Sequence, residues 1–276
     1  MIIAQYFVEF IFYSFLGWIW ESIYCSAKER KWADRGFLFG PICPIYGACV
    51  VAASIVFGSF SFLSSPDFPV WATFIICYVG SAIAEFSTSW VLEKRFHARW
   101  WDYSEVPLNI QGRVCVPVSI GFGLAGVVAV RFLIPSIEGF HAVVNPAVYE
   151  VLAIVFAGLI GADIALTEAS LSTLLKEVEQ MHEEFNIKAQ AQYEKIASTP
   201  KLIEQKIIEE KELAELKREQ FVKTYANKLT LNQKRILLGI QKFIPTRRTT
   251  DEETASSFIP LTVALRKKVF ELRKGE

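Results

Sequence analysis

Glu21 and Glu85 each lie inside an apolar stretch of the sequence, where burying a charged side chain is costly. Glu21 is near the end of the run from Ile2 to Tyr24, and Glu85 is near the end of the run from Val70 to Leu92. A carboxylate facing hydrocarbon costs about 3 kcal/mol, so such a residue usually turns toward a bundle interior and marks a functional site. The two glutamates are therefore expected to face one polar cavity.

The surroundings of the two glutamates are alike, which predicts an internal repeat. Gly17 precedes Glu21 by one helical turn, as Ser81 precedes Glu85. A basic stretch and a Gly-x-x-Cys motif then follow each glutamate, with motif positions at Gly40, Cys43, Gly112 and Cys115. Because both copies would start on the same side of the membrane, a parallel two-span repeat is expected.

Further polar residues lie beside the two Gly-x-x-Cys motifs. Arg35 precedes the first motif and Arg113 lies within the second, where both are expected to pair with the glutamates. The second copy also carries Asp102 and Asn109 in an insertion rich in Trp and Tyr. The candidates for a substrate or polar cavity are Glu21, Arg35, Glu85, Asp102, Asn109 and Arg113. The alternative is that the charged pairs only hold the bundle together.

Glycines and prolines cluster where the second apolar stretch begins. Gly40, Pro41 and Pro44 surround Cys43, a composition that predicts a broken helix start or a re-entrant segment. Backbone groups freed in this way must be buried in protein or line a wet cavity. Structural roles are expected for Gly17, Gly40, Pro41, Cys43, Pro44, Gly112 and Cys115.

Five apolar stretches approach the ~20 residues that a membrane-spanning helix needs. They cover about residues 3–24, 41–63, 70–92, 114–134 and 147–166, in a chain that is 52% hydrophobic. The predicted fold class is therefore all-α: a polytopic helical membrane protein with a transmembrane domain over residues 1–166. The first stretch has no basic n-region and is expected to be a retained span.

Basic residues in the short loops predict the orientation. The loops after the first and third stretches hold most of the short-loop Lys and Arg, whereas residues 64–69 contain none. Short loops rich in Lys and Arg lie on the cytoplasmic side. The chain is therefore expected to be a multi-pass protein of the cell membrane, with its N-terminus outside and its C-terminus in the cytoplasm.

The polar remainder of the chain has helical periodicity. A mainly apolar, heptad-like stripe steps by four and three through Leu171, Leu175, Val178, His182, Phe185, Ala189, Gln192 and Ile196. Pro200 interrupts it, and a second helix is expected over about 201–243. Residues 167–245 are therefore predicted to form a cytoplasmic helical hairpin or a coiled coil, the latter with a partner such as another copy of the chain.

The last part of the chain, residues 246–276, is predicted to contain a flexible segment and a short amphipathic helix over 261–272. The helix is expected to begin at Leu261, beyond a polar stretch rich in Thr, Ser and acidic residues. These elements complete the expected division of the chain into a transmembrane domain, helical tail and C-terminal segment.

Composition and motifs exclude several functions. The 29 basic and 29 acidic residues give no net charge, and the charges of the tail are mixed, so no nucleic-acid partner is expected. The five cysteines have no CxxC spacing and the three histidines are scattered, so no metal or other cofactor is expected. No catalytic constellation is recognisable, so an enzyme is the less favoured class, and a lipid-handling enzyme stays an alternative.

Three motifs resemble those of the bacterial type IV ABC-transporter permease family. They are Phe15–Glu21, Arg35–Gly47 and Trp101–Ser104, the last with Asn109, Gly112, Arg113 and Cys115. The resemblance covers about residues 1–135 and departs from the family pattern at Ser119–Gly123, where Trp-Gly is expected. It implies a membrane-embedded transport component, working with a separate ATPase.

Three functions therefore stay open at this point. A transport component would need that ATPase, because the sequence has no Gly-x-x-x-x-Gly-Lys-Ser/Thr loop. A membrane scaffold or sensor would act through the helical tail. A lipid-handling enzyme would use the paired carboxylates for acid–base chemistry.

The orientation can be tested by cysteine labelling. Ser65→Cys is expected to react with a membrane-impermeant thiol reagent added outside the cell. Ser198→Cys should react only when the reagent reaches the inside, and the wild-type chain gives the background from its own cysteines. The opposite labelling pattern would contradict the predicted orientation.

Overall fold

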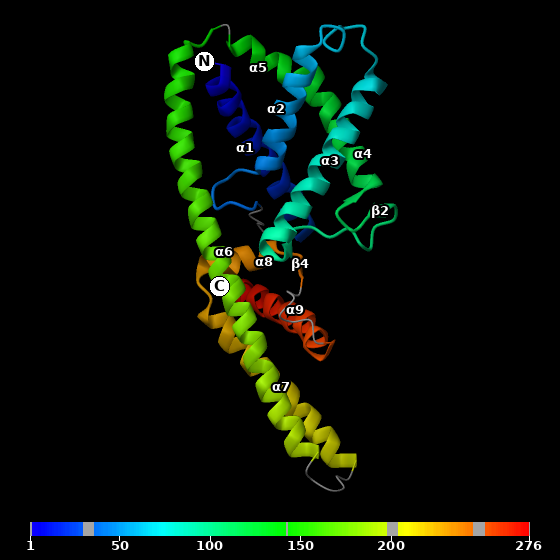
Figure 1. The fold of residues 1–276 in the computed structure, drawn as a ribbon, viewed down its shortest axis with the longest axis vertical. Helices are drawn as coiled ribbons and strands as arrows, with labels where there is room; N and C mark the ends of the chain where they lie inside the picture. The colour runs from blue at the N-terminus through cyan, green and yellow to red at the C-terminus, as the bar shows by residue number, and fades with distance from the viewer. Residues whose placement is uncertain (1, 30–35, 142, 198–203, 245–251, 276) are drawn as a thin grey trace. The chain divides into compact units, whose positions relative to one another are not determined.

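A computed structural model describes residues 2–29, 36–141, 143–197, 204–244 and 252–275 (Figure 1). Most of these residues are helical, which confirms the all-α class. The chain divides into two compact units. The membrane unit comprises Met1–Lys94 and Trp100–Thr167, and the tail unit comprises Arg95–Arg99 and Glu168–Glu276.

Apolar helices build the membrane unit. They are α1 (Ile2–Glu29), α2 (Pro44–Ser59), α3 (Val70–Phe96), α4 (Val116–Val128), the π-helical turn η1 (Ala129–Leu133), α5 (Ile134–His141) and the start of α6 (Pro146–Ala197). Within this unit α1, α3 and α6 run in one direction and α2 and α4 in the other (Figure 1). Glu21 and Glu85 are therefore near the same end of the unit.

Four helical stretches in the described part of the chain are long and apolar enough to cross a membrane. They are Ile2–Ala27, Val70–Phe96, Val116–His141 and Pro146–Ile187. The second predicted span, 41–63, is helical only over Pro44–Ser59. At 1.5 Å per residue this helix is about 24 Å long, shorter than a hydrocarbon core of about 30 Å. The five-span count therefore stays a prediction.

Missing side chains let α1 and α2 approach closely. A Cβ at Gly17 would overlap the Tyr46 side chain, and a Cβ at Gly47 would overlap the Ser14 hydroxyl and the Phe10 carbonyl. Small residues at such crossings allow helices in a membrane to gain packing contacts. The helix pair is therefore defined by two glycines, one on each partner.

Helices α3 and α4 meet in a similar way. A Cβ at Gly123 would come within 2.7 Å of the Phe74 ring, and a Cβ at Gly126 would overlap Cys77. Beyond this contact, Arg131 of η1 donates hydrogen bonds to the carbonyls of Pro66 and Phe68 in the α2–α3 loop. The π-helical turn thus carries the side chain that fixes this loop.

Helices α2 and α4 begin alike. Cys43 and Cys115 are the N-caps, both in extended conformation, and a proline occupies the first or second helical position. Proline suits this position because the first helical N–H groups have no partner within the helix. The likeness is what a repeat would produce, although the repeat itself stays a prediction. Cys115 also ends the hairpin of β2 (Asn109–Ile110) and β3 (Val114–Cys115).

The tail unit has its own apolar core. Its other elements are α7 (Glu204–Lys228), α8 (Leu231–Gly239), α9 (Glu252–Gly275), and the antiparallel strands β1 (Ala98–Arg99) and β4 (Lys242–Phe243). Its fully buried side chains include Leu171, Leu174, Met181, Leu237, Ile240, Leu261, Leu265 and Val269. Leu171, Val178 and His182 of the predicted stripe on α6 are thus buried within this unit.

The tail differs from the sequence expectation in two places. The helix expected over 201–243 is broken, because Thr230 starts a new helix through a capping box with Gln233 and Lys242–Phe243 pair with β1. The last helix begins at Glu252, before the predicted Leu261, and residues 246–251 of the expected flexible segment lie outside the described residues. Local capping and strand pairing thus override the helical periodicity.

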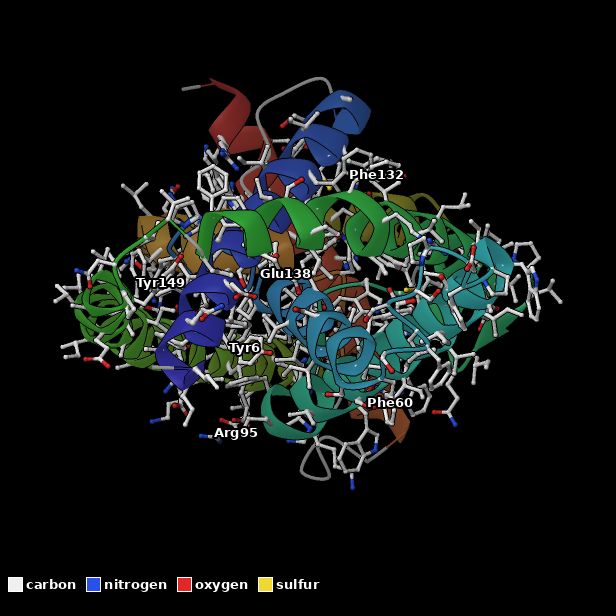
Figure 2. The ribbon with its side chains drawn as sticks, turned by 90° about the horizontal axis from the view of Figure 1, so that it is seen from above. Tyr6, Phe60, Arg95, Phe132, Glu138 and Tyr149 are labelled. Atoms are coloured by element: carbon white, nitrogen blue, oxygen red, sulfur yellow. The ribbon has the colours of Figure 1, made fainter. Side chains whose placement is uncertain are left out.

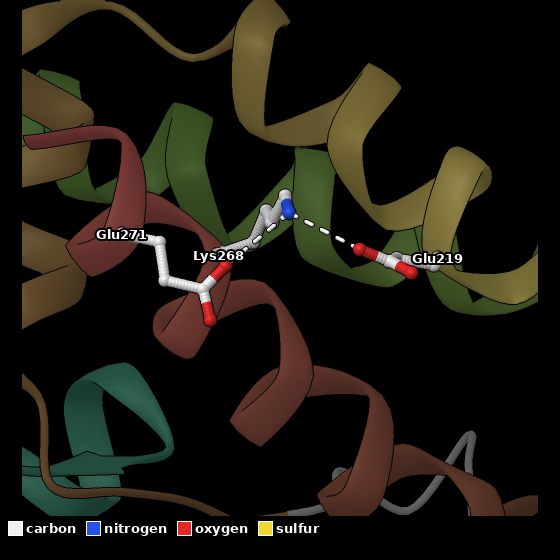
Figure 3. Close-up of polar contacts among 3 residues, drawn as sticks. All are labelled: Glu219, Lys268 and Glu271. Carbon is white, nitrogen blue, oxygen red and sulfur yellow. Dashed lines mark hydrogen bonds and ion pairs between the residues drawn. The ribbon is translucent and has the colours of Figure 1, made fainter. Parts of the chain in front are cut away.

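Charged residues also join helices of the tail unit. Lys268 of α9 donates hydrogen bonds to Glu219 of α7 and to Glu271, both at 3.2 Å (Figure 3). The two carboxylates raise the pKa of Lys268, so this lysine stays charged. Exposed contacts of this kind contribute little to stability, so the apolar core is what holds the unit together.

Glycine positions on α2 provide a matched test of the α1–α2 contact. Gly47→Ala is expected to lower the free energy of unfolding by about 1–3 kcal/mol, because its Cβ collides with backbone of α1. Gly58→Ala, on the same helix, meets nothing within 4 Å and should be neutral or slightly stabilising. Denaturant unfolding of the purified protein measures both. Equal effects would contradict the proposed packing.

Candidate substrate site

Glu21 accepts a hydrogen bond from a tyrosine on the neighbouring helix. The Tyr46 hydroxyl, in the first turn of α2, donates to Glu21 Oε2 at 2.5 Å. The ring of Tyr46 occupies the space that Gly17 leaves free, one turn before Glu21 on α1. The glycine that permits close helix packing therefore also positions the hydrogen-bond donor for the carboxylate.

Glu85 is more deeply buried and less completely bonded. Glu85 is 5% exposed, and its Oε1 accepts a hydrogen bond of 3.3 Å from the Tyr103 hydroxyl. Its Oε2 has no hydrogen-bond partner among the described residues. Glu85 lies close enough to Glu21 for their charges to interact. We refer to Glu21, Tyr46, Glu85 and Tyr103 as the Glu–Tyr cluster.

Tyr103 comes from the loop between α3 and α4, and its environment keeps it a donor. Burial raises the pKa of its hydroxyl, and the negative charge of Glu85 raises it further. The phenol therefore stays protonated at neutral pH and can donate to the carboxylate. Both tyrosines of the cluster thus supply hydrogens to a glutamate without adding charge.

Arg113 pairs with Glu93, rather than with Glu85 as expected. Arg113 is buried, and its Nη2 lies 2.9 Å from Glu93 Oε1. It also donates to the Ser89 hydroxyl at 3.4 Å and lies over the Phe86 ring. Glu93 follows Glu85 on α3 by about two helical turns, so Arg113 contacts α3 about two turns beyond Glu85. The other expected partner, Arg35, lies outside the described residues.

Asp102 and Asn109 organise the loop that carries Tyr103. Asp102 Oδ1 accepts hydrogen bonds from the backbone and hydroxyl of Ser104, the latter at 2.5 Å. Asn109 accepts from the Gly112 N–H at 2.9 Å and donates to the Val106 carbonyl at 2.7 Å. Gly112 has φ +68°, a conformation that glycine adopts without strain. These contacts of both polar residues lie within the loop.

Asp163 on α6 is a polar residue that the sequence analysis missed. Its two carboxylate oxygens accept hydrogen bonds from the N–H groups of Phe39 and Gly40, at 2.9 and 2.8 Å. Thr167 donates to it at 3.2 Å. A Cβ at Gly40 would come within 2.8 Å of Asp163 Oδ2, which explains the glycine. An aspartate inside the last apolar stretch was the signal that could have found it.

The segment before α2 is non-helical, and its backbone is satisfied by other elements. The Cys43 N–H donates to the Ser14 carbonyl of α1 at 2.9 Å, and the N–H groups of Phe39 and Gly40 donate to Asp163. Pro41 is exposed in this segment and Pro44 begins α2. Irregular backbone at membrane depth requires such internal partners. Within the described ranges, no group of three His, Cys, Asp or Glu side chains could hold a metal ion.

The apolar helices with carboxylates in their interior define a multi-pass helical membrane protein. Residues 8–168, more than half of the chain, match the family described as "Putative ABC-transporter type IV". The chain belongs to this family, which confirms the resemblance in its sequence motifs. Comparison with curated proteins and with solved structures gave no match.

The Arg113–Glu93 pair can be tested against an exposed pair. Glu93→Gln leaves the charge of Arg113 buried without its carboxylate and is expected to lower the free energy of unfolding by about 3–5 kcal/mol. Glu168→Gln breaks the exposed pair with Arg95 and should cost less than about 1 kcal/mol. Both values come from denaturant unfolding. A small effect of Glu93→Gln would show that the buried arginine does not depend on this pair.

Proposed function

We propose that the chain is the membrane-embedded subunit of a transport system and that the Glu–Tyr cluster binds a cationic substrate. The observation that carries this proposal is the Glu85 carboxylate, which is buried and has an oxygen without a hydrogen-bond partner among the described residues. A carboxylate in this position is costly unless a proton or a cation joins it.

The charges around the cluster favour a cation over an anion. Two carboxylates interact within it, and the two tyrosines contribute no charge. Arg113, the basic residue expected to offset them, is engaged by Glu93. The tyrosine rings add faces that attract positive groups. The proposed roles are therefore substrate binding for Glu21 and Glu85, and support of the loop for Asp102, Asn109 and Arg113.

We further propose that the cluster is near the inner side of the cell membrane and that a separate ATPase supplies energy. The first statement rests on the basic loops, which would place the ends of α1 and α3 toward the cytoplasm. The second rests on the family, together with a sequence that contains no phosphate-binding Gly-x-x-x-x-Gly-Lys-Ser/Thr loop. Self-association through the tail helices stays a prediction.

A regulatory tail is a second candidate function, favoured by one contact. Strands β1 and β4 pair within the tail unit, and β1 lies in the chain between Glu93 and Tyr103. A partner that disturbs this pairing would pull on the loop that carries Tyr103. Removing residues 204–276 separates the alternatives: a transport subunit should keep cation binding, whereas a scaffold or sensor should lose its function altogether.

Cation binding provides the direct test. Ligand that binds only the folded protein stabilises it by about 2.7 kcal/mol at a hundred times its Kd. Sodium, magnesium and tetramethylammonium chlorides would be screened by thermal unfolding of the purified protein. At least one is expected to stabilise the wild type, and the gain should be lost in Glu85→Gln and reduced in Glu21→Gln.

The control is Glu150→Gln, which removes an exposed carboxylate from α6. This variant should keep the full stabilisation by the cation. The proposal is contradicted when every salt affects the wild type and Glu85→Gln equally. A chloride-dependent effect is recognised by repeating the screen with the corresponding nitrate salts.

A further inference from the structure

A second buried acidic site lies at the opposite end of α1. Glu9 is 5% exposed, and its Oε1 lies 2.9 Å from His141 Nε2 of α5. The other ring nitrogen of His141 is 2.8 Å from the Tyr149 hydroxyl of α6, and Gln5 donates to Glu9 at 3.4 Å. Three helices therefore contribute to one titratable site, which we call the Glu9–His141 site.

A second carboxylate, on an exposed residue, lies near this site. Glu138 of α5 acts electrostatically on Tyr13, which Glu9 also reaches, and Glu9 acts on Tyr149 (Figure 2 labels Glu138 and Tyr149 in a view onto this end). The facing titratable groups are thus Glu9, Tyr13, Glu138, His141 and Tyr149. One histidine among two carboxylates can hold an exchangeable proton, as in the acid and histidine relays of membrane pumps.

Buried hydroxyls lie on α1 between this site and the Glu–Tyr cluster. Glu9, Tyr13, Gly17 and Glu21 are spaced by one helical turn and so follow one side of the helix. Tyr13 is 2% exposed and Ser14 is fully buried, and neither hydroxyl has a hydrogen-bond partner in the described part of the chain. Tyr46 fills the gap at Gly17.

We propose that this row conducts protons between the Glu9–His141 site and the Glu–Tyr cluster. Neither the Tyr13 nor the Ser14 hydroxyl hydrogen-bonds to another polar group in the described residues, so water molecules would bridge the row. A hydroxyl then accepts a proton from water on one side and releases its own to water on the other. The net result is a proton lost from His141 or Glu9 and gained by Glu21 or Glu85. The distance along α1 is about 18 Å. The inference rests on the proposed function in one respect, because the proposed proton path ends at the Glu–Tyr cluster.

The key variant is Tyr13→Phe, because it removes a hydroxyl that has no partner and keeps the ring. Such a change leaves no other group unsatisfied, so the protein should fold normally. Tyr24→Phe is the matched control, on the same helix and 60% exposed. A purely structural role for the Glu9–His141 pair, tying α1 to α5, would make Tyr13→Phe silent.

Proton flux is measured with the purified full chain in vesicles of phosphatidylcholine and phosphatidylglycerol. A potassium gradient with valinomycin drives protons inward, and trapped pyranine reports the internal pH. The wild type and Tyr24→Phe are expected to exceed protein-free vesicles. Tyr13→Phe and Glu9→Gln are expected to lower the flux by about a hundredfold or more, the typical contribution of a positioned proton-transfer group.

Two results would overturn the proposal: wild-type flux equal to that of protein-free vesicles, or Tyr13→Phe flux equal to wild type. Cation-dependent stabilisation of Tyr13→Phe should match the wild type, so either failure leaves the proposed substrate site intact. Conversely, the proton flux could depend on Tyr13 while no cation stabilises the protein. That result would reject the cationic substrate and leave the proton path intact.

Discussion

The absence of water from the bilayer core is the constraint on which the membrane unit depends. Every polar group at this depth needs a partner within the protein. Glu21 and Glu85 accept hydrogen bonds from tyrosines, Arg113 pairs with Glu93, and Asp163 binds the N–H groups of the segment before α2. Glu85, by contrast, has one buried oxygen with no such partner in the described structure, as do the buried hydroxyls of Tyr13 and Ser14.

Close helix contact is what allows these partners to meet. Gly17 makes room for Tyr46, whose hydroxyl then reaches Glu21. The loop after α3 is stabilised by hydrogen bonds from its own polar side chains and by the positive φ of Gly112. In this loop conformation the Tyr103 hydroxyl lies within hydrogen-bond distance of Glu85. Packing and chemistry therefore depend on the same small residues, and a change at one of them would affect both.

Part of this arrangement could be predicted from the sequence. Carboxylates in apolar runs identify Glu21 and Glu85, because their cost in hydrocarbon is a local property of the chain. Tertiary contacts determine which residues form ion pairs and hydrogen bonds. The sequence therefore did not indicate that Arg113 would pair with Glu93 or that Tyr103 would donate to Glu85. In the tail, periodicity indicated helices, but the β1–β4 pair joins strands far apart in the chain and leaves no periodic signal.

Glu21 and Glu85 are proposed to form one electrostatic site. A double-mutant cycle tests it most directly, using unfolding free energies of the wild type, Glu21→Gln, Glu85→Gln and the double variant at neutral pH. Residues that share a site couple by about 0.5–3 kcal/mol, whereas independent residues add within about 0.5 kcal/mol. Coupling is expected, with the second substitution costing more than it does alone, because the first has already removed the repulsion between the two carboxylates. Simple additivity would contradict a shared site.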